Sequence, residues 1–330
     1  MSDDDGRQGM SATADSGVRL LRVDAAAAGQ RIDNYLLAQL KGAPRSLIYR
    51  ILRRGEVRVN KGRVKPSHRL AAGDQVRLPP VRLGPERAPA QPSPAAAARL
   101  AEAVLYEDDQ VLVLDKPAGM AVHGGSGISL GVIETLRALR PGAELELVHR
   151  LDRDTSGCLL IAKRRSALRR LHAQLREGRV DKRYLVLLAG RLPRRVVEVR
   201  APLRKNLLRG GERMVQVDEA EGKPARTIFR TVQALGPLTL AEAELDTGRT
   251  HQIRVHAASL GAPVAGDEKY GDAAANARLR ALGLKRLFLH AAALSFRPLD
   301  DEPPVHAEAP LPAALVEVVA TLEKQPWTSI

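Results

Sequence analysis

The sequence predicts an α+β fold in two domains. Strand-like and helical segments follow one another without the regular alternation that a doubly wound parallel sheet requires. A stretch rich in proline and alanine separates a short part from a longer part. The chain has 330 residues, of which 44% are hydrophobic, so each part can bury a core. We therefore expect a disordered N-terminus at residues 1–17, a small domain at 18–80, an extended linker at 81–98 and a large domain at 99–330.

The charge of the chain favours a polyanionic partner, with nucleic acid the leading candidate. The formal net charge is +14 at pH 7. Residues 29–80 alone contain 12 lysines or arginines and three acidic residues, which leaves a local net charge of +9. Such a balance describes association and does not define a fold.

Cysteine usage and hydropathy indicate a cytoplasmic protein. Cys158 is the only cysteine, which excludes an internal disulfide and a cysteine zinc cluster and is typical of a reducing compartment. The N-terminal residues contain no apolar signal region, and no apolar stretch is long enough to cross a bilayer.

Two short helices are expected in the small domain. RIDNYLLAQL places Ile32, Leu36 and Leu40 at helical spacing. RSLIYRILRR lies between Pro44 and Gly55, residue types that commonly begin and end helices. EVRVN, a turn at residues 60–62, and GDQVRL then predict short strands.

The second of these helices has a cationic face. Its apolar side chains cluster on one side of a helical wheel, whereas its arginines and one tyrosine lie on the other. A solvated basic surface is the ordinary explanation of a charge run. A compact helix–helix–strand unit with arginine on one face instead favours nucleic-acid binding. The side chains that we expect to contact nucleic acid in this domain are Arg45, Tyr49, Arg50, Arg53, Arg54 and Lys61.

The large domain is expected to open with a pair of strands in VLYEDDQVLVLDK, followed by a Lys-Pro turn. Gly124, Gly125 and Gly127 come next and could indicate a phosphate-binding loop. No GK[ST] follows them, and their spacing does not match a dinucleotide fingerprint. We therefore expect a flexible loop.

The segment HRLDRDTSG, residues 149–157, is the strongest candidate for a site. It leads directly into CLLIA, a predicted core strand, so its polar side chains are held at fixed positions. Asp152 and Asp154 could form a glycosidase pair. Residues two apart in an extended segment leave little room for a substrate between them, so we expect one catalytic carboxylate, Asp152. We expect Asp154 to bond backbone amides of the loop and His149 to be structural.

A later strand and helix carry further candidates. KRYLVLLAG predicts a strand that begins at Tyr184, whose ring could support a base that has been extruded from an RNA stack. In TGRTHQIRVHAASLG we expect a helix that Thr250 caps and Gly261 ends. Arg254 lies on this helix, and a cation beside Asp152 would keep the carboxylate ionised.

Each of these residues also has an ordinary structural explanation. Asp152 could form a turn, Tyr184 could belong to the core and Arg254 could be a surface cation. Lys116 is expected to support the site or a nucleic-acid backbone. His251 shares a helical face with Arg254, but a metal site of His251 with a histidine five residues later is not expected, because this spacing does not align ligands.

Taken together, the motifs resemble known families. RIDNYL and SLIYRILRRGEVRVNKGRVKPSHRLAAGDQVRL are similar to the S4 domain, a small RNA-binding module. HRLDRDTSG, preceded by KPAG and VHGGSG and followed by KRYLVL, TGRTHQIRVH and GDEKYG, resembles the RluA-type pseudouridine synthase family. The resemblance extends from about Val104 to Phe296. Within this family, more than one subgroup carries an S4 domain. The resemblance favours one of them over another, on the basis of three stretches: QRIDNYL, SLIYRILRRGEVRVNKGR and AVHGGSGISLGVIETLRALRP.

This resemblance implies a pseudouridine synthase catalytic fold with a mixed, mainly antiparallel sheet, preceded by the S4-like domain. It implies an isomerase that converts uridine to pseudouridine in large-subunit (23S) ribosomal RNA, at several sites near the peptidyl transferase centre, by base flipping. Asp152 is then the essential aspartate, Tyr184 stacks on the flipped uracil and Arg254 pairs with the aspartate. Arg150 is expected to occupy the space that the flipped nucleotide leaves. No cofactor or metal is implied, and we expect a monomer.

Several alternatives stay open from the sequence. The target could be another RNA, such as transfer RNA, or the chain could be a non-catalytic S4-type RNA-binding assembly factor. An RNA or nucleoside glycosidase that uses the aspartate pair is a third possibility. Within the synthase reading, Asp152 could attack C1′ or C6 or support a glycal route, and either Tyr184 or water could take the C5 proton.

Overall fold

The structure is a computed structural model that describes residues 17–40, 42–81, 91–124, 130–207, 213–299 and 301–324. The chain divides into two compact units, Met1–Pro89 and Ala90–Ile330, and each is described by itself. Residues 1–16 of the expected disordered N-terminus lie outside the described residues, as do Gly125 and Gly127 of the expected glycine-rich loop. Among the helices that the structure describes, none is both long and apolar enough to span a membrane.

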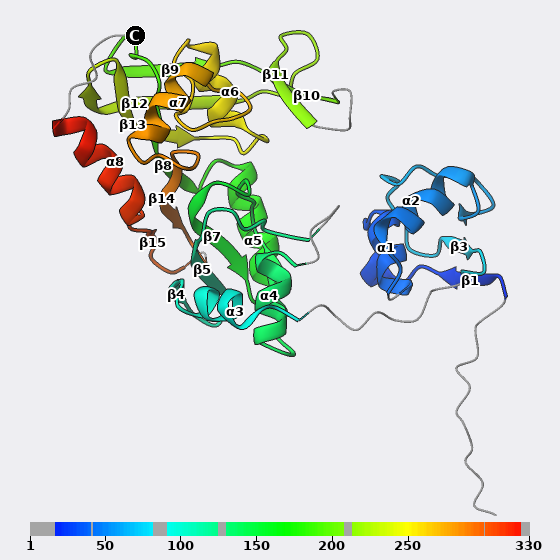
Figure 1. The fold of residues 1–330 in the computed structure, drawn as a ribbon. Coiled ribbons are helices and arrows are strands. Elements are labelled where there is room, and N and C mark those ends of the chain that lie inside the picture. Colours follow the sequence, from blue (N-terminus) through cyan, green and yellow to red (C-terminus); the bar gives the residue numbers. More distant parts are fainter. Residues whose placement is uncertain are drawn as a thin grey trace, which may run out of the picture. The chain divides into compact units, whose positions relative to one another are not determined.

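The N-terminal unit packs two helices against a small antiparallel sheet of strand order β1-β3-β2 (Figure 1). Its elements are β1 (Arg19–Arg22), the 3-10 helix η1 (Ala25–Ala27), α1 (Ile32–Gln39), α2 (Arg45–Arg54), β2 (Arg58–Val59) and β3 (Gln75–Leu78). Ile32, Leu36 and Ile48 are fully buried in its core. The two helices and the short strands that the sequence predicts in this region are confirmed.

Helix α2 and the following turn have the ends that their sequence predicts. Pro44 is the N-cap of α2, and Gly55 ends the helix with a φ of +71°, a conformation that glycine adopts at little cost. Asn60 and Lys61 both have positive φ and form the tight turn before β3. The side-chain oxygen of Asn60 accepts a hydrogen bond from the backbone N–H of Gln75, which holds this turn against the sheet.

The expected extended linker is wrong at its C-terminal end, because a helix, α3 (Pro94–Ala101), lies there. Ser93 caps this helix by accepting a hydrogen bond from the N–H of Ala96, and Pro94 is its first residue. The four alanines that follow have the highest helix propensity of any residue. Leu100 is fully buried and anchors α3 in the core of the C-terminal unit. An alanine run has no apolar periodicity, which is why the pattern of the sequence does not reveal the helix.

The C-terminal unit is built on one ten-stranded sheet with the path β4-β5-β7-β14-β8-β13-β12-β9, on which β6 pairs with β7 and β15 with β14 (Figure 1). All strand pairs are antiparallel except β7 with β14, so the expectation of a mixed, mainly antiparallel sheet is confirmed. The strands are β4 (Val104–Glu107), β5 (Val111–Lys116), β6 (Glu146–Leu147), β7 (Ser156–Ala162), β8 (Asp181–Leu188), β9 (Val196–Arg200), β12 (Arg226–Leu235), β13 (Leu238–Leu245), β14 (Leu289–Phe296) and β15 (Val305–Glu308). Strand β8 begins three residues before Tyr184, which therefore lies inside the strand and not at its start.

Helices cover both faces of this sheet. The remaining helices are α4 (Val132–Leu139), α5 (Arg165–Arg176), α6 (Gln252–Ser259), α7 (Ala273–Ala281) and α8 (Ala313–Lys324). Side chains of α3, α4 and α6 share one hydrophobic cluster with the sheet, whereas α5 packs in a second cluster and α7 and α8 in a third. Strand β7 is accordingly buried along its whole length, as expected for a strand covered on both faces.

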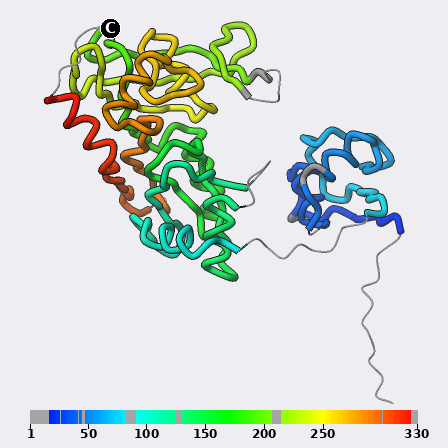
Figure 2. Tube along the Cα trace, in the orientation of Figure 1, coloured from blue at the N-terminus to red at the C-terminus, as the bar shows by residue number. Residues whose placement is uncertain are grey.

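A separate hairpin extends from this unit. It consists of β10 (Leu203–Leu207) and β11 (Arg213–Val217), and Figure 2 shows it projecting beyond the sheet. The base of the hairpin is anchored because Leu203 and Val215 are buried in a small cluster with Val255 of α6.

The parallel pair of β7 and β14 positions the HRLDRDTSG loop, which ends where β7 begins. The two strands meet at Ser156 and His290, whose side chains form a hydrogen bond of 2.9 Å. Gly157 has a φ of +106°, and a Cβ atom there would clash with the backbone carbonyl of Ala291. Only glycine therefore allows these two strands to approach each other at the start of β7.

Candidate active site

A buried lysine supports the loop that carries Asp152. Lys116, the last residue of β5, has no exposed surface. Its ammonium group donates to the carbonyl oxygens of Pro117, Met120 and Arg153 at 2.8, 2.8 and 3.0 Å. Burial lowers the pKa of Lys116 to about 7, and the nearby Arg286 adds to this effect. Lys116 was expected to support either the site or a nucleic-acid backbone, and these hydrogen bonds support the loop of the site.

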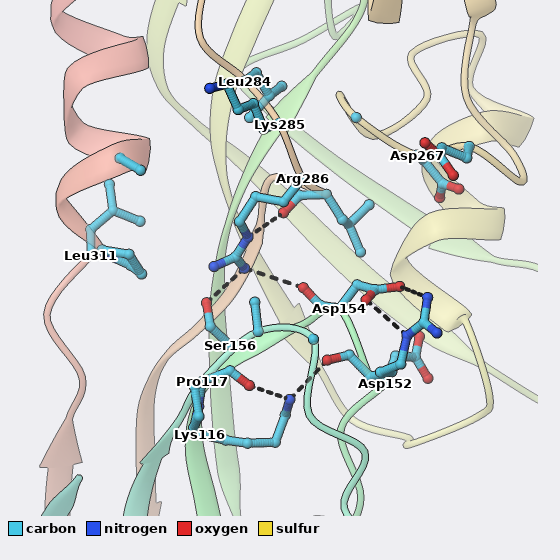
Figure 3. Close-up of a pocket in the computed structure, with 18 of the residues that line it drawn as sticks. Lys116, Pro117, Asp152, Asp154, Ser156, Asp267, Leu284, Lys285, Arg286 and Leu311 are labelled. Carbon is cyan, nitrogen blue, oxygen red and sulfur yellow. Dashed lines mark hydrogen bonds and ion pairs between the residues drawn. The ribbon is translucent and has the colours of Figure 1, made fainter. Parts of the chain in front are cut away.

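A second cation, Arg286, supports the same loop from the side of β14. One of its terminal nitrogens donates to the backbone carbonyl of Asp154 at 3.2 Å and to the hydroxyl of Ser156 at 2.8 Å (Figure 3). Arg286 is not among the site residues predicted from the sequence, because it belongs to none of the motifs considered there. It fixes the loop at the point where the chain enters β7.

The expected role of Asp154 is wrong, whereas that of His149 is supported. Within the described residues, the Asp154 carboxylate pairs with the neighbouring Arg153 and accepts no backbone amide, because it points to the surface. His149 accepts a hydrogen bond at Nε2 from the N–H of Leu160 at 3.1 Å. Burial lowers the pKa of His149 to about 4, so this imidazole is a neutral structural acceptor near pH 7.

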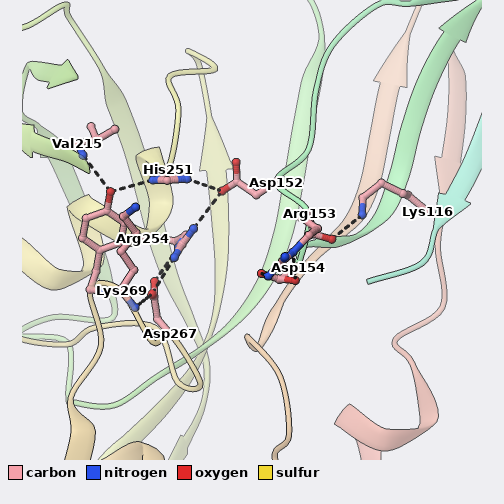
Figure 4. A network of polar contacts seen from close by, with 10 residues as sticks. Lys116, Asp152, Arg153, Asp154, Val215, His251, Arg254, Asp267 and Lys269 are labelled. Carbon is pink, nitrogen blue, oxygen red and sulfur yellow. Dashed lines mark hydrogen bonds and ion pairs between the residues drawn. The ribbon is translucent and has the colours of Figure 1, made fainter. Parts of the chain in front are cut away.

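Asp152 meets Arg254 at the start of helix α6, as the sequence predicts. The closest atoms of the pair, Asp152 Oδ2 and Arg254 Nη1, are 3.4 Å apart. Arg254 is held more tightly by Asp267, whose two carboxylate oxygens accept from Nε and Nη2 at 2.7 and 2.8 Å (Figure 4). This two-point contact leaves Nη1 as the part of the guanidinium directed to Asp152.

Asp267 is fully buried and ionised. Burial alone would raise the pKa of this carboxyl, but the Arg254 guanidinium and the backbone N–H groups of Tyr270 and Lys269 hold the pKa below its usual range. Asp267 and Tyr270 belong to GDEKYG and are not among the site residues predicted from the sequence. The only signal for them is the cluster of polar residues between two glycines in that segment.

His251 lies on the other side of Asp152. Its Nε2 is 3.8 Å from Asp152 Oδ2, and its Nδ1 is 2.8 Å from the hydroxyl of Tyr270. The expected capping of α6 by Thr250 is wrong, because His251 is the N-cap and has a left-handed backbone with a φ of +54°. The turn is held instead by Gln252, whose side-chain oxygen accepts from the N–H of Arg249 at 3.0 Å.

The second histidine of this helix is structural. His256 contacts the hydroxyl of Thr227 at 2.8 Å through Nδ1 and the carbonyl of Ala201 at 2.9 Å through Nε2. Within the described ranges, no three histidine, cysteine or acidic side chains form a group that could hold a metal ion.

Tyr184 lies beside Asp152 in a small pocket of about 60 Å³, which Leu245 and Ile253 also line. Only 7% of Tyr184 is exposed, so the ring faces the pocket from within the core. Burial, followed by the nearby Asp152, raises the pKa of the Tyr184 phenol. The hydroxyl is therefore protonated at neutral pH.

Asp152 also lies on the wall of a large open cleft of about 1510 Å³ (Figure 3). This volume exceeds that of a typical small-molecule pocket, which is about 300–1,000 Å³. The cationic side chains that line it are Arg99, Lys116, Arg150, Arg153, Arg254, Lys269, Arg280, Lys285 and Arg286. Arg150 is exposed and lines both the cleft and the small pocket. Carboxylates line the cleft too, but they are fewer: Glu102, Asp115, Asp152, Asp154, Asp267 and Glu268. A cleft of this size with an excess of cations is suited to a polyanionic chain.

In the N-terminal unit, the predicted contact residues divide into three groups. Arg50, Arg53, Arg54 and Lys61 are exposed. Tyr49 is half-buried, and its hydroxyl donates to Asp33 at 3.0 Å, so its contact with nucleic acid stays a prediction. Arg45 is the first residue of α2, and its side chain lies outside the described part of the structure.

Comparison with known proteins gives one family for each unit. Residues 110–259 match the model of the RNA pseudouridylate synthase family, and residues 30–76 match the S4 domain model. The chain is 54% identical to the ribosomal large subunit pseudouridine synthase C of Salmonella typhimurium (strain LT2), across 92% of this chain and 97% of the relative. It is 55% identical to the enzyme of the same name from Escherichia coli (strain K12), across 90% of this chain and 94% of the relative.

Solved structures agree with this result. The human RNA pseudouridylate synthase domain containing 4 has a TM-score of 0.58 with 25% sequence identity, across 69% of this chain and 96% of that chain. The human RNA pseudouridylate synthase domain containing 1 has a TM-score of 0.55 with 28% identity, across 71% of this chain and 99% of that chain.

Proposed function

Because the chain belongs to the RNA pseudouridylate synthase family and carries an S4 domain, we propose that it isomerises specific uridines of large-subunit (23S) ribosomal RNA. The family predicted from HRLDRDTSG and its flanking motifs is confirmed, and so is the resemblance to RluC, the large-subunit synthase C. The protein is an RNA pseudouridine synthase, an isomerase. The names of its relatives support the large ribosomal subunit as the source of the target RNA, and we propose several target uridines near the peptidyl transferase centre.

The observation that carries the proposal is the position of Asp152. Its carboxylate lies between a basic cleft and a small pocket, 3.4 Å from a guanidinium that a second carboxylate holds in place. A flipped uridine could therefore place its glycosidic bond beside Asp152 while its flanking phosphates stay in the cleft. We assign Asp152 as the catalytic carboxylate on this basis.

In the proposed reaction, the bond between N1 of uracil and C1′ of ribose breaks, and a bond between C5 and C1′ forms. The proton on C5 is lost, and N1 gains a proton. Asp152 acts in its ionised form, by attack on C1′ or C6 or through a glycal route. Arg254 keeps the carboxylate oriented, Tyr184 supports the face of the flipped uracil, and Arg150 occupies the space left in the RNA.

This chemistry needs no redox cofactor, because the substrate and the product are isomers of equal oxidation state. It also needs no metal, because in each of these routes a side-chain carboxylate acts as the nucleophile or the base. We propose that RNA is the partner of the chain, that the enzyme acts as a monomer, and that it works in the cytoplasm, where ribosomal RNA is assembled with its proteins.

The test uses ribosomal RNA transcripts that carry tritium at uridine C5. Wild-type protein should release tritium to water without releasing uracil, and Asp152→Asn should reduce this rate by more than about a thousandfold. Asp154→Asn is the matched control and should retain activity, since among the described residues its half-exposed carboxylate pairs with Arg153 and not with Asp152 or Arg254. Release of free uracil would instead indicate a glycosidase, and RNA binding without tritium release would indicate an assembly factor.

Mapping of the product then tests the target. Pseudouridine at several positions of large-subunit RNA would support the proposal. Pseudouridine only in transfer RNA would contradict the proposed substrate while leaving the proposed chemistry intact.

A further inference from the structure

His251 lies between the catalytic carboxylate and Tyr270, a residue outside the predicted site. We propose that Tyr270 fixes His251 in the tautomer that carries its proton on Nε2, and that His251 thereby positions Asp152. The inference rests on the proposed function for its catalytic consequence, whereas the tautomer itself is a property of the protein alone. His251 is then a positioning residue of the site.

The direction of the hydrogen bonds follows from the backbone of β11. The N–H of Val215 lies 3.0 Å from the Tyr270 hydroxyl oxygen, and a backbone N–H can only donate. The hydroxyl oxygen thus accepts from Val215, and its own proton is free to be donated. Within the described residues, its second contact is Nδ1 of His251, at 2.8 Å. A hydroxyl oxygen can accept two hydrogen bonds, but among the described residues Nδ1 is the acceptor within reach of the Tyr270 proton, so we assign Tyr270 as the donor and Nδ1 as unprotonated.

A neutral imidazole that accepts at Nδ1 carries its single proton at Nε2. The charge state is consistent with this. Burial lowers the pKa of His251, Arg254 and Lys269 lower it further, and Asp152 and Asp267 oppose the shift. The imidazole is accordingly neutral at pH 7, and its Nε2–H is directed to Asp152.

Both donors near Asp152 are on the same oxygen. Arg254 Nη1 is 3.4 Å from Oδ2, and His251 Nε2 is 3.8 Å from it (Figure 4). These distances are longer than ordinary hydrogen bonds, and such contacts in enzymes tighten when the substrate binds. Two donors at Oδ2 leave Oδ1 as the oxygen that is directed to the substrate.

The backbone of His251 is a second, independent observation. Within the described residues, only three residues other than glycine have a positive φ. Two of them, Asn60 and Lys61, form a hairpin turn, where this conformation is common. His251 adopts it at the start of a helix, which costs conformational energy that the surrounding structure must supply. Residues held in this way cluster at functional sites, and here the conformation brings the imidazole beside Asp152.

The chain of contacts also links the site to the hairpin of β10 and β11. Val215 is buried against Val255 of helix α6, and Tyr270 packs on the same cluster. The guanidinium of Arg254 lies 5.0 Å from the centre of the Tyr270 ring, a cation–π contact that fixes the ring from its other side. These contacts fix the Tyr270 side chain, so its hydroxyl group can hold the His251 imidazole in one tautomer.

The tautomer can be measured directly in the full-length protein. Histidine ¹⁵N NMR at pH 7 should show an unprotonated Nδ1 and a protonated Nε2 for His251, with the signals identified by their loss in His251→Asn. In Tyr270→Phe the same signals should shift toward a mixture of tautomers. A protonated Nδ1 in the wild type, or an imidazolium at pH 7, would overturn the proposal.

Two substitutions separate the donor of His251 from its acceptor. Glutamine places an amide N–H near the position of Nε2, whereas asparagine keeps only an acceptor near Nδ1. With tritiated ribosomal RNA under single-turnover conditions, His251→Asn should be about tenfold slower than wild type at saturating RNA, because the hydrogen bond to the Asp152 carboxylate that forms on substrate binding is lost. His251→Gln should stay within about threefold. The RNA concentration for half-maximal rate should change little in either variant.

The two variants also control for the backbone. Asparagine adopts a left-handed conformation more readily than glutamine, so a slow Asn variant cannot be attributed to strain. Equal rates for the two variants would overturn the positioning role, as would a change confined to the RNA concentration dependence, which would indicate an RNA contact. Absence of tritium release from the wild type would contradict the proposed function instead, and the NMR measurement would still decide the tautomer.

Discussion

At the scale of single residues, Asp267 determines how Arg254 can serve the site. Asp267 accepts two short hydrogen bonds from the guanidinium, whereas the contact of Arg254 with Asp152 is 3.4 Å long. Two carboxylates thus share one cation, and the buried one holds it more tightly. Arg254 is therefore oriented before it meets Asp152, and its side-chain freedom is already lost.

Replacing Asp267 with asparagine should destabilise the protein and slow the reaction. The substitution leaves the buried guanidinium of Arg254 without its main partner, which should lower the free energy of unfolding by about 3 kcal/mol. Urea denaturation and single-turnover tritium release measure the two effects. Glu268→Gln is the matched control, because the Glu268 side chain is 86% exposed and should change neither quantity. Equal stability of both variants would contradict the role given to Asp267.

The same carboxylate should contribute to the acid sensitivity of folding. The pKa of Asp267 is lowered in the folded protein, so its stabilising contribution is complete above the unfolded pKa of about 4 and is lost as the pH falls through the folded pKa. Wild-type stability should therefore fall more steeply with acidification below about pH 4 than that of Asp267→Asn. Urea midpoints measured between pH 2 and 7 test this, and parallel acid limbs would be evidence against it.

The sequence could predict the contact of Asp152 with Arg254, because each residue belongs to a motif that resembles the family and a carboxylate attracts a cation. It could not predict Asp267 or Tyr270, because their contacts depend on how the segment after α6 folds back onto that helix. For His251, helical spacing predicted a face shared with Arg254. The two side chains do lie together, both near Asp152, although His251 is the N-cap of the helix. Its contact with Tyr270 required three-dimensional information.

At the scale of elements, local sequence patterns predict which segments form helices and strands, but they do not predict which strands pair. The periodicity of RIDNYLLAQL and the apolar run CLLIA predict α1 and β7 correctly. Sequence periodicity does not predict helix α3, because a run of alanines has no amphipathic pattern. The parallel pairing of β7 with β14 could not be read at all, since it joins segments that are 134 residues apart at Ser156 and His290.

This pairing makes Gly157 a sensitive position. Gly157→Ala should lower the free energy of unfolding by about 3 kcal/mol or more, because the new methyl group meets the carbonyl of Ala291 and the backbone has positive φ. Gly142→Ala separates the two effects, since Gly142 also has positive φ but has open space around it, and should cost about 1 kcal/mol. Chemical denaturation of both variants gives the comparison. Similar losses would show that the close approach of β7 and β14 is not tight.

At the scale of the whole molecule, we propose that the N-terminal unit contributes RNA affinity and that the C-terminal unit carries out the chemistry. The N-terminal unit has its own core and a set of exposed cations on α2, whereas the carboxylate and its partners all belong to the C-terminal unit. Charges that neutralise phosphates affect binding and its dependence on salt.

The triple substitution of Arg50, Arg53 and Arg54 by glutamine should therefore weaken RNA binding and flatten its salt dependence. If each arginine neutralises one phosphate, the slope of log affinity against log salt should decrease in magnitude by about 2. Filter binding over a range of salt concentrations gives the slope, and the single-turnover rate at saturating RNA should stay as in wild type. An unchanged slope would show that these arginines do not contact the RNA.

The pairing of β7 with β14 also determines when, during its synthesis, the protein can become active. The ribosome makes Ser156 well before His290, and at about 5–20 residues per second the 134 residues between them take on the order of 10 s to synthesise. During this interval the loop with Asp152 has been made, but strand β14 and the arginine at residue 286 do not yet exist. The nascent chain is therefore an incomplete enzyme until its last strands emerge, and its own synthesis delays the moment at which it can act on ribosomal RNA.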